Sequence, residues 1–372
     1  MEMESRFNTK LDELKATGNF RILPEQPDSA LLNLSSNDYL GLSEDENLYH
    51  EFLDSLSKKR LSFTASSSRL LSGNSVEYGQ LENLIASTYE KESCLLYNSG
   101  YHANVGIISA LAGKNDLIVS DKFIHASLID GVRLSKAQVM RYRHLDHDHL
   151  ENILASHRDE YDQVFILSES IFSMDGDLAD LEKLVELKQK FNCFLYLDEA
   201  HAVGAVGQMG LGLAETSGLI SEIDFIVGTF GKALASVGAF VCCKKLFKDY
   251  LVNHSRTLIY TTALPPVNLA WSKFIFERLP DFQSLRKGLK NLSDQFARQL
   301  GQIPQSHIIP FIIGANEATI AQSKSLKANG FHVLPIRYPT VLQGTARLRF
   351  SLNAKMTKEQ LQPIIKLLKE NE

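Results

Sequence analysis

Short apolar runs alternate with longer amphipathic stretches through much of the chain. An apolar run of this length is typical of a buried strand, and apolar residues three or four positions apart are typical of a helix. The predicted strands lie at residues 94–97, 117–119, 139–140, 164–167, 194–198, 225–228 and 237–241, with helices near 81–85, 126 onward, 148–156 and 179–190. Strands that alternate with helices predict a mostly parallel sheet covered on both faces.

From about residue 256 the pattern changes. We expect helices at 267–278, 285–300 and 316–328, strands at 308–313, 331–334 and 347–352, and a last helix that opens with the capping-box pair Thr357 and Gln360. The alternation in 347–352 is typical of a half-exposed strand. The predicted fold is therefore α/β, with an N-terminal segment at 1–50 that carries an amphipathic helix at 5–17, a large α/β domain at 51–255 and a smaller C-terminal α+β domain at 256–372.

Lys232 lies among small residues between two predicted strands, which makes its amine a candidate for chemistry. Burying an ammonium group is costly unless the charge is paired or its pKa falls. A neutral lysine amine is a nucleophile that forms Schiff bases with aldehydes and ketones. The alternative is a loop lysine whose stem carries the charge to solvent.

Asp198 favours the chemical interpretation of Lys232. It ends an apolar run, and open α/β sheets bind ligands at the carboxyl ends of their strands. Pyridoxal phosphate enzymes need such a pair, because a lysine binds the cofactor's aldehyde and a carboxylate keeps the pyridine nitrogen protonated. For Asp198 and Glu199 taken alone, a helix N-cap is the alternative.

Several polar stretches have both a structural and a functional interpretation. Residues 33–42 are either a turn from strand to helix or part of a site. The turn at 98–104 has the form of an anion site, as do many turns from strand to helix. His125 is either a helix-cap residue or an aromatic plate over a cofactor ring, whereas the charged run with His144, His147 and His149 is typical of a solvated surface.

Composition describes an ordinary globular protein, since 44% of the 372 residues are hydrophobic and 22% are charged. The formal net charge of −5 gives no support for nucleic-acid binding. We expect no signal segment and no membrane span, because no apolar run is long enough. The cysteines match neither a zinc site nor a disulfide framework, so we expect no metal and buried free thiols in a cytoplasmic protein at Cys94, Cys193, Cys242 and Cys243.

Seven short motifs carry a resemblance that covers nearly the whole chain. They lie at residues 36–42 (SNDYLGL), 68–73 (SRLLSG), 125–128 (HASL), 172–176 (FSMDG), 198–201 (DEAH), 229–232 (TFGK) and 344–349 (GTARLR). Together they are similar to the motifs of the α-oxoamine synthases, a subgroup of the fold-type I pyridoxal phosphate-dependent transferases. The resemblance implies a mostly parallel central sheet with a smaller C-terminal α+β domain, and pyridoxal 5'-phosphate as the cofactor.

The resemblance also implies a role for each candidate residue around that cofactor. Lys232 would bind the aldehyde, Asp198 would pair with the pyridinium nitrogen, and His201 would hydrogen-bond the phenolic oxygen and polarise the acyl carbonyl. His125 would stack on the ring, beside both cofactor and substrate. Further cofactor contacts would come from Gly100, Tyr101, Ser173, Thr229, Thr261 and Thr262. Thr261 and Thr262 would reach the cofactor of the neighbouring subunit in a homodimer with shared active sites.

For the substrates, the resemblance implies that Arg349 holds the carboxylate of the amino acid, for which a guanidinium is well shaped. Arg21, Asn37 and Thr340 would line the substrate channel. Residues 256–266 (RTLIYTTALPP) look most like the members that condense L-alanine with pimeloyl-CoA or a pimeloyl-carrier protein to give 8-amino-7-oxononanoate for biotin synthesis. The alternatives are a relative that joins glycine or serine to another acyl-CoA, and a non-catalytic partner subunit, which usually lacks the lysine.

Two positions depart from the family pattern. Residues 64–67 (TASS) replace glycines that usually precede the SRLL sequence, and Ala235 stands where glycine is frequent. Side chains at 64–67 would narrow the substrate channel. The sequence therefore does not determine the length of acyl chain that the channel accepts.

Overall fold

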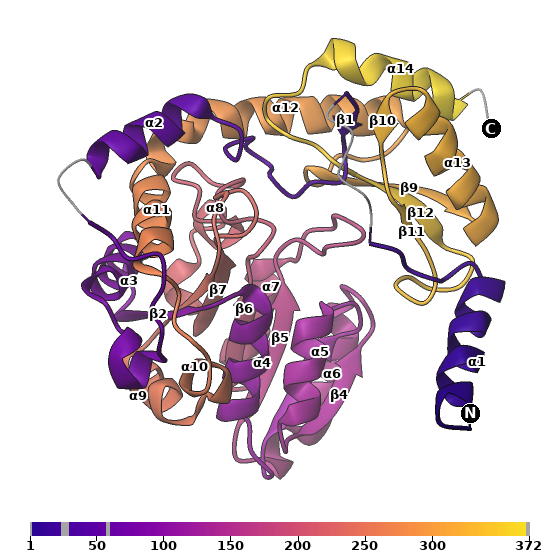
Figure 1. The fold of residues 1–372 in the computed structure, drawn as a ribbon. Coiled ribbons are helices and arrows are strands. Elements are labelled where there is room, and N and C mark those ends of the chain that lie inside the picture. Colours follow the sequence, from indigo (N-terminus) through magenta and orange to yellow (C-terminus); the bar gives the residue numbers. More distant parts are fainter. Residues whose placement is uncertain (1, 24–29, 57–59, 370–372) are drawn as a thin grey trace. The chain divides into compact units, whose positions relative to one another are not determined.

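The structure, a computed structural model, describes residues 2–23, 30–56 and 60–369. The chain divides into two compact units, whose elements are labelled in Figure 1. Unit 1 comprises Met1–Ser36, Met174–Gly176 and Lys290–Glu372, and unit 2 comprises Asn37–Ser173 and Asp177–Leu289. No helix of the described residues is long and apolar enough to cross a membrane.

Unit 2 is built on a sheet that has seven strands within the described residues, in the order β2-β8-β7-β6-β5-β3-β4. Its strands are β2 (Ser93–Tyr97), β3 (Leu117–Asp121), β4 (Gln138–Tyr142), β5 (Val164–Glu169), β6 (Phe194–Asp198), β7 (Phe225–Thr229) and β8 (Ala239–Cys243). Strand β8 runs antiparallel to both its neighbours, and the other pairs are parallel. The predicted mostly parallel sheet is therefore confirmed.

Helices surround this sheet. They are α2 (Glu46–Ser55), α3 (Val76–Thr88), α4 (Gly100–Leu111), α5 (Ala126–Leu134), α6 (His147–His157), α7 (Leu181–Lys190), α8 (Leu213–Thr216), α9 (Lys245–His254), α10 (Arg256–Ile259) and α11 (Pro266–Glu277). Short turns of other helix types are η1 (Arg69–Gly73), η2 (Arg158–Glu160), η3 (Ile220–Glu222) and η4 (Leu279–Phe282). The side chains of Asp45, Ser99, Asp146 and Asp180 cap helices by accepting from the N–H three residues on.

The core of unit 2 lies between the sheet and its helices. Strands β2, β3, β5, β7 and β8 are buried along their whole length, as expected when helices cover both faces of a sheet. Helices α4 and α5 lie side by side against the sheet (Figure 1) and contribute Ile107, Ile108 and Leu128 to the core. All four cysteines are buried free thiols, as predicted.

Unit 1 contains an antiparallel sheet in the order β11-β12-β9, formed by β9 (Ile308–Gly314), β11 (Pro335–Ile336) and β12 (Ala346–Ser351). A separate parallel pair joins β1 (Leu32–Asn33) to β10 (Phe331–His332). Its helices are α1 (Glu2–Ala16), α13 (Asn316–Ala328) and α14 (Lys358–Lys369), and the division between the units falls inside α12 (Gln283–Gln299).

Two expectations for unit 1 have clear outcomes. The capping box is confirmed, because Thr357 N–H donates to Gln360 Oε1 (2.8 Å) and Gln360 N–H donates to Thr357 Oγ1 (3.3 Å). The prediction of a half-exposed strand at 347–352 is wrong, because every residue of β12 is buried. Its polar positions can be buried because they have partners: Arg347 pairs with Asp175, and Arg349 Nη1 donates to Ser351 Oγ (2.5 Å).

The units divide the chain at other positions than the predicted domains. Residues 1–36 belong to unit 1, where β1 pairs with β10. Residues 256–289 belong to unit 2, where α11 packs on α3. The predicted N-terminal helix exists as α1, but its apolar residues Phe7, Leu11 and Leu14 are exposed.

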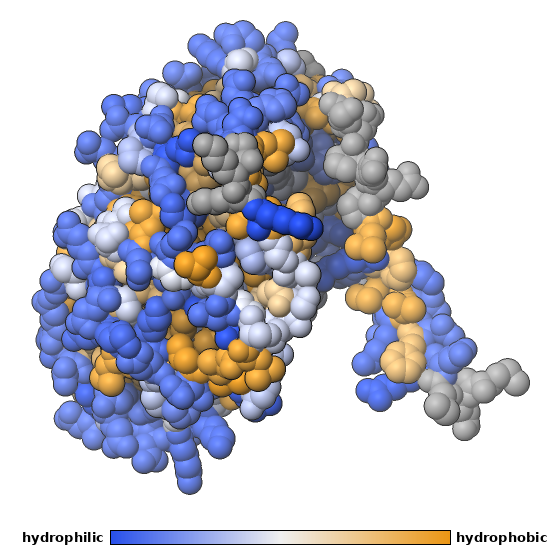
Figure 2. Space-filling model, turned by 60° about the vertical axis from the view of Figure 1, so that its left-hand side comes forward, coloured by the Kyte–Doolittle hydropathy of each residue, from blue (hydrophilic) through white to orange (hydrophobic). Residues whose placement is uncertain are grey.

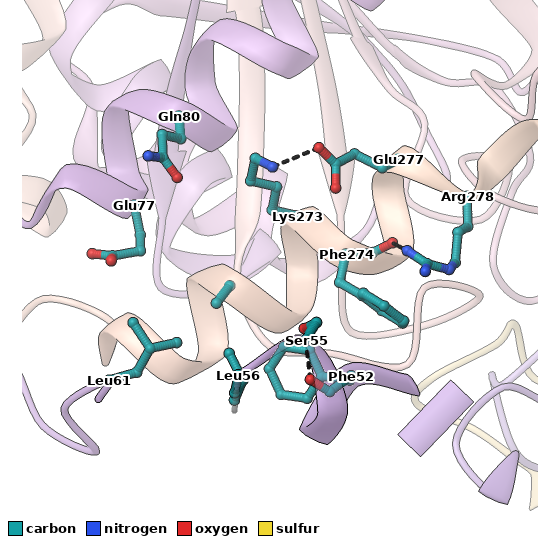
Figure 3. A pocket seen from close by; sticks show the side chains of 11 residues that line it. Phe52, Ser55, Leu56, Leu61, Glu77, Gln80, Lys273, Phe274, Glu277 and Arg278 are labelled. Atoms are coloured by element: carbon teal, nitrogen blue, oxygen red, sulfur yellow. Dashed lines mark hydrogen bonds and ion pairs between the residues drawn. The ribbon is translucent and has the colours of Figure 1, made fainter. Parts of the chain in front are cut away.

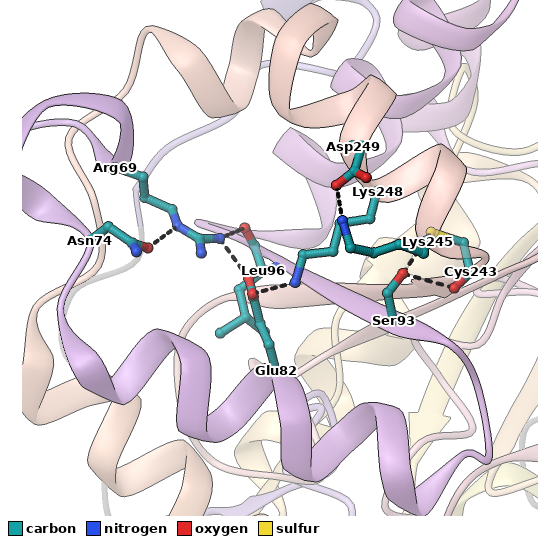
Figure 4. A network of polar contacts seen from close by, with 9 residues as sticks. All are labelled: Arg69, Asn74, Glu82, Ser93, Leu96, Cys243, Lys245, Lys248 and Asp249. Carbon is teal, nitrogen blue, oxygen red and sulfur yellow. Dashed lines mark hydrogen bonds and ion pairs between the residues drawn. The ribbon is translucent and has the colours of Figure 1, made fainter.

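A buried carboxylate links four elements at one end of unit 2 (Figure 4). Glu82, in α3, accepts from Arg69 Nη1 (2.7 Å), Lys248 Nζ (2.7 Å) and Leu96 N–H (3.0 Å). The Arg69 guanidinium also lies 3.9 Å from the ring centre of Tyr78. Removing one member of such a buried ion pair typically costs about 3–5 kcal/mol, since it leaves an uncompensated charge. The arginine of the SRLLSG motif therefore anchors η1 to α3 and β2.

His144 is not on a solvated surface, as the charged run around it suggested. Its Nδ1 lies 2.9 Å from Asp121 Oδ1 and its Nε2 lies 3.0 Å from Asp177 Oδ2. Its ring packs between those of Phe123 and Phe172, with centroids 4.6 and 4.5 Å away. Burial alone would lower the pKa of His144, but the two carboxylates outweigh it and raise that pKa to about 9.

We expect the stabilisation by His144 to be fully present below about pH 6.5, the pKa of an unfolded histidine, and to be lost as the pH rises through about 9. Between these values the folded chain binds more protons, so the free energy of unfolding falls as pH rises. Urea unfolding of the wild type and His144→Gln between pH 6 and pH 10 measures this difference, with the exposed His50→Gln as the control. Equal pH slopes in the wild type and His144→Gln would contradict the assignment.

Candidate functional site

The carboxyl ends of the central strands of unit 2 bring polar residues to one edge of the sheet. Glu169 ends β5, Asp198 ends β6 and Thr229 ends β7. Glu169 and Asp198 are direct neighbours in the register of β5 and β6. Both carboxyl-bearing side chains are buried, so this edge holds acidic groups with little access to water. Open α/β sheets bind ligands at this edge.

Lys232 lies in the turn that follows β7, half-buried, and its Nζ is 2.7 Å from Nε2 of the buried His201. On the other side of the ring, His201 Nδ1 is 2.6 Å from the hydroxyl of the fully buried Tyr39. The predicted pair of Lys232 and His201 is therefore in direct contact. A lysine that shares a hydrogen bond with an imidazole has a partner for proton transfer.

The Asp198 carboxylate is held on both oxygens. Oδ2 accepts from Asn104 Nδ2 (2.7 Å), and Oδ1 accepts from the N–H of Ala200 (2.9 Å). Asn104 is itself buried and held in place, because its Oδ1 accepts from Tyr196 Oη (2.6 Å) and its Nδ2 also donates to Ser127 Oγ (2.9 Å). Asp198 opens a turn and not a helix, so the N-cap alternative is wrong.

His125 is the N-cap of α5, since its Nδ1 accepts from the N–H of Ser127 (3.2 Å). His125 is exposed at the surface of unit 2, but protein groups lie beneath its ring. The partial loss of water around the ring lowers its pKa. The positive charge of Lys232 lowers it further, while Asp198 opposes the shift. The ring is therefore neutral near pH 7, with its hydrogen on Nε2. The cap interpretation is confirmed, and the aromatic plate stays a prediction.

Glu169 lies beneath His125 and accepts a hydrogen bond from its backbone N–H. Burial, together with the neighbouring Asp198 carboxylate, raises the pKa of Glu169 well above its usual range. Glu169 therefore holds its proton more tightly than an exposed glutamate does, which reduces the negative charge beside Asp198. Glu199 has a structural position: it accepts from the N–H groups of Leu213 and Ala214 at the start of α8, and burial raises its pKa to about 7.

The turn from β2 to α4 faces the end of β7. The side chain of Ser99 caps α4 by accepting from the N–H of His102. At Gly100, the first residue of the helix, an added Cβ would lie 3.9 Å from Thr229 Cβ and 4.0 Å from Thr229 Oγ1. Thr229 Oγ1 in turn accepts from the N–H of Gly231 (3.2 Å). A helix N-terminus beside a hydroxyl is suited to an anion such as phosphate.

The other predicted site residues lie in different surroundings. Tyr101 is half-exposed and donates to Asp130 Oδ2 (2.7 Å), which raises the pKa of Tyr101. Ser173 is buried in the turn after β5, and Asn37 contacts Tyr39. Arg21, Thr340 and Arg349 belong to unit 1, where the first two are exposed and Arg349 is buried.

Thr261 and Thr262 line a pocket of about 530 Å³ with the serines of the SRLLSG region. Its lining residues are Ser66, Ser67, Ser68, Leu70, Leu71, Ile259, Tyr260, Thr261 and Thr262. A second pocket, of about 290 Å³, lies between α2, α3 and α11 (Figure 3) and contains no predicted site residue. It is bordered by the ion pair of Lys273 and Glu277, 2.5 Å apart, and by the ring of Phe274.

Both departures from the family pattern fall on left-handed backbone. Ser66 has φ of 52° and Ala235 has φ of 45°. Residues other than glycine pay about 1–2 kcal/mol for this conformation, because Cβ approaches a carbonyl oxygen. Local hydrogen bonds hold both turns: Ser66 N–H donates to Thr64 Oγ1 (3.1 Å), and Ala235 N–H donates to Lys232 O (3.0 Å). Both positions therefore keep a left-handed conformation without glycine.

Four contacts at the site were not expected from the sequence: those of Tyr39, Asn104, Glu169 and Tyr196. Tyr39 lies in the SNDYLGL motif, so its position was marked although its partner was not. Asn104 is the last residue of the turn predicted at 98–104 and lies in α4; the predicted turn indicated an anion site and not a partner for a carboxylate. Tyr196 lies in a predicted strand, where a polar hydroxyl in an apolar run was the available signal, whereas Glu169 lies two residues beyond the strand predicted at 164–167 and had no such signal.

The amine of Lys232, the buried carboxylate of Asp198 and the anion site at α4 match the aldehyde, pyridine nitrogen and phosphate of pyridoxal phosphate. Residues 29–368 match the family model of aminotransferases of class I and II. A protein of Neisseria meningitidis is 50% identical over 370 residues, which cover 95% of this chain and 97% of the relative. A protein of Haemophilus influenzae is 49% identical over 378 residues, which cover 97% and 99%. Both are named, provisionally, as 8-amino-7-oxononanoate synthases.

Solved structures that resemble this chain include serine palmitoyltransferases and an 8-amino-7-oxononanoate synthase. Serine palmitoyltransferase of Sphingomonas wittichii is 28% identical, with a TM-score of 0.89 over 99% of this chain and 96% of its own. A serine palmitoyltransferase of S. paucimobilis with bound PLP is 26% identical, with a TM-score of 0.89 over 99% and 97%. The 8-amino-7-oxononanoate synthase of Francisella tularensis is 30% identical, with a TM-score of 0.78 over 92% and 98%. The predicted fold class, a fold-type I transferase, is confirmed.

Asn104→Ala removes the side chain that holds both Asp198 and Tyr196, and leaves their buried polar atoms without this partner. We expect a loss of about 1–3 kcal/mol in the free energy of unfolding and about tenfold weaker binding of pyridoxal phosphate. Thermal unfolding and absorbance titration with the cofactor measure the two effects. Asn253→Ala, which removes an exposed amide, is the control. Wild-type cofactor affinity in a folded Asn104→Ala protein would show that Asp198 does not depend on Asn104.

Proposed function

Because this chain belongs to the aminotransferase class I and II family, we propose that it condenses L-alanine with pimeloyl-CoA or a pimeloyl-carrier protein. The products are 8-amino-7-oxononanoate, carbon dioxide and the free thiol. The chain is a pyridoxal phosphate-dependent enzyme of the acyltransferase type. The observation that carries the choice of reaction is the identity of about half of all residues, over nearly the full length, with proteins named for this product.

Pyridoxal phosphate, when bound, supplies an electron sink that stabilises negative charge on the α-carbon of the amino acid. Lys232 would hold the cofactor by its aldehyde, and its free amine would serve as the general base that removes the α-proton of the amino acid. Asp198, held by Asn104 and Ala200, keeps the pyridine nitrogen protonated. His201 receives or returns a proton across its 2.7 Å contact with Lys232 Nζ.

The remaining residues orient the reactants. The ring of His125 would stack on the cofactor, with Ser173 beside it, and Gly100, Tyr101 and Thr229 would hold the cofactor at its phosphate end. Arg349 holds the carboxylate of the amino acid until carbon dioxide leaves. Arg21, Asn37 and Thr340 line the channel of the acyl chain.

A second candidate reaction joins serine or glycine to another acyl-CoA. It is favoured by the serine palmitoyltransferases, whose TM-scores of 0.89 exceed the 0.78 of the 8-amino-7-oxononanoate synthase. A TM-score compares backbones, whereas the choice of amino acid and acyl chain depends on the side chains of the pocket. The relatives that share half of the side chains therefore have more weight, and alanine is the preferred substrate.

We also propose that the enzyme is a homodimer with shared active sites. Thr261 and Thr262 lie in the pocket whose rim includes Leu71 (83% exposed) and Tyr260 (71% exposed). Figure 2, which turns this side of the molecule forward, shows apolar side chains in separate groups on a largely polar surface. Burying such side chains against a second copy favours association, and a closed two-fold dimer uses the same surface on both partners. The two threonines would then contact the partner's cofactor.

Thiol release from pimeloyl-CoA tests the reaction, with L-alanine, glycine and L-serine supplied separately to the holoenzyme. We expect release with alanine to exceed release with the other two by at least about tenfold, and Lys232→Ala to abolish it while the protein stays folded. Release that favours glycine or serine would support the second candidate. Turnover near the wild-type rate in Lys232→Ala would overturn both, and a cofactor-binding protein without any release would point to another acyl donor or to a non-catalytic subunit.

Mixing two inactive variants tests the shared site. Lys232→Ala lacks the catalytic amine, and the double variant Thr261→Ala/Thr262→Ala lacks the contacts to the partner's cofactor. After subunits exchange, one site in each mixed dimer has all its groups, so we expect about a quarter of the wild-type activity. Activity no higher than the mean of the two variants, or sedimentation as a monomer, would contradict the proposal.

A further inference from the structure

Tyr39 stands in a line of hydrogen bonds that ends at the nucleophilic lysine. Its hydroxyl lies 2.9 Å from Asn37 Oδ1 and 2.6 Å from His201 Nδ1. The opposite nitrogen of that imidazole, Nε2, lies 2.7 Å from Lys232 Nζ. The order is therefore Asn37, Tyr39, His201 and Lys232. Neither the resemblance nor the proposed reaction assigns a role to Tyr39.

The hydrogens along this line can be counted. A tyrosine hydroxyl has one hydrogen to donate, and an amide oxygen only accepts. Tyr39 therefore donates to Asn37 Oδ1, and the hydrogen in its short contact with His201 must come from Nδ1. A neutral imidazole with its hydrogen on Nδ1 has a lone pair on Nε2, which here faces Lys232.

We propose that Tyr39 is a positioning residue that holds His201 in the Nδ1–H tautomer, so that Nε2 is the proton acceptor for Lys232. Asn37 accepts the hydroxyl hydrogen of Tyr39, so that the Tyr39 oxygen acts as an acceptor toward His201. The importance of this tautomer for turnover rests on the proposed function, because it concerns the proton of the lysine. The tautomer itself is a property of the protein alone.

Because this line of hydrogen bonds is buried, the donor and acceptor of each bond are strongly determined. Tyr39 is fully buried and His201 is 6% exposed, so water has little access to either. A buried N–H or hydroxyl that loses its partner pays its desolvation cost, which is larger in a low-dielectric interior. The reverse direction would need Tyr39 to donate to Nδ1 and Asn37 to turn its NH2 group toward the hydroxyl. His201 would then donate from Nε2 and could no longer accept the proton of Lys232.

Nitrogen NMR of the apoprotein, labelled with ¹⁵N-histidine, measures the tautomer directly, at a pH where the His201 ring is neutral. His201→Gln identifies the resonances. We expect hydrogen on Nδ1 in the wild type and in Asn37→Asp, whose carboxylate still accepts. In Tyr39→Phe and Asn37→Leu we expect a loss of this preference. Hydrogen on Nε2 in the wild type, or an unchanged Nδ1–H pattern in Tyr39→Phe, would overturn the proposal.

Kinetics of the holoenzyme provide the second measurement. We expect Tyr39→Phe to lower kcat by about ten- to a hundredfold, with KM for the amino acid changed by less than about twofold. Tyr89→Phe is the matched control, because it also removes one buried hydroxyl, which donates to Leu211 O (2.9 Å). A merely structural role would affect stability in both variants and kcat in neither, and equal kcat values would overturn the role in turnover. If the wild type itself releases no thiol, the proposed function fails while the NMR result still decides the tautomer.

Discussion

The placement of one lysine amine beside two buried carboxyl groups is the constraint on which the rest of the site depends. Lys232, Asp198 and Glu169 come from the ends of neighbouring strands, where backbone packing leaves little water. Two ionised carboxylates side by side in this environment would repel each other. The raised pKa of Glu169 weakens this repulsion, because it favours the neutral form of one of the two groups. A parallel sheet suits this arrangement because it brings the ends of non-adjacent segments to one edge.

Around these charges lies a layer of neutral hydrogen-bonding groups that hold their geometry. Asn104 donates to both Asp198 and Ser127, and the hydroxyl of Ser127 contacts His125, the N-cap residue of α5. Tyr39 holds the far side of His201. Neutral donors and acceptors orient a charged group without adding charge of their own, so they leave the balance between Lys232 and the carboxylates undisturbed. The same buried layer makes the site rigid, because each polar atom that lost its partner would pay a desolvation cost.

In two turns, one at the SRLLSG motif and one at Lys232, residues other than glycine adopt a backbone conformation that usually favours glycine. Ser66 and Ala235 occupy left-handed backbone, at positions where the family resemblance implies that glycine is frequent. Each turn is held by hydrogen bonds from neighbouring residues, and Trp271 Nε1 also donates to Ala235 O (2.9 Å). The turn geometry around the SRLLSG motif and Lys232 therefore survives the loss of glycine. Of the two side chains, that of Ser66 lines the pocket that also contains Thr261 and Thr262.

The sequence by itself determined the order of the elements and the positions of Asp198 and Lys232. Hydrophobic periodicity marks buried strands, and the residue after such a strand must lie at the edge of the sheet. The capping box at Thr357 and the family motifs are equally local signals, and both were readable before the fold was known. The cofactor class also follows from them, because a lysine and a carboxylate at strand ends are what that chemistry needs.

Only the tertiary structure decided which side chains meet. Tyr39 contacts a histidine 162 positions away, and Asn104 contacts Asp198 across 94 positions. Burial of β12 and of His144 also differed from the local pattern, because distant carboxyl partners, Asp175 for Arg347 and Asp177 for His144, compensate their polar groups. Hydrophobic periodicity indicates only which face of a helix or strand is turned toward the core. The partner on that face is set by the packing of segments that are remote in the chain, and a single sequence has no local signal for it.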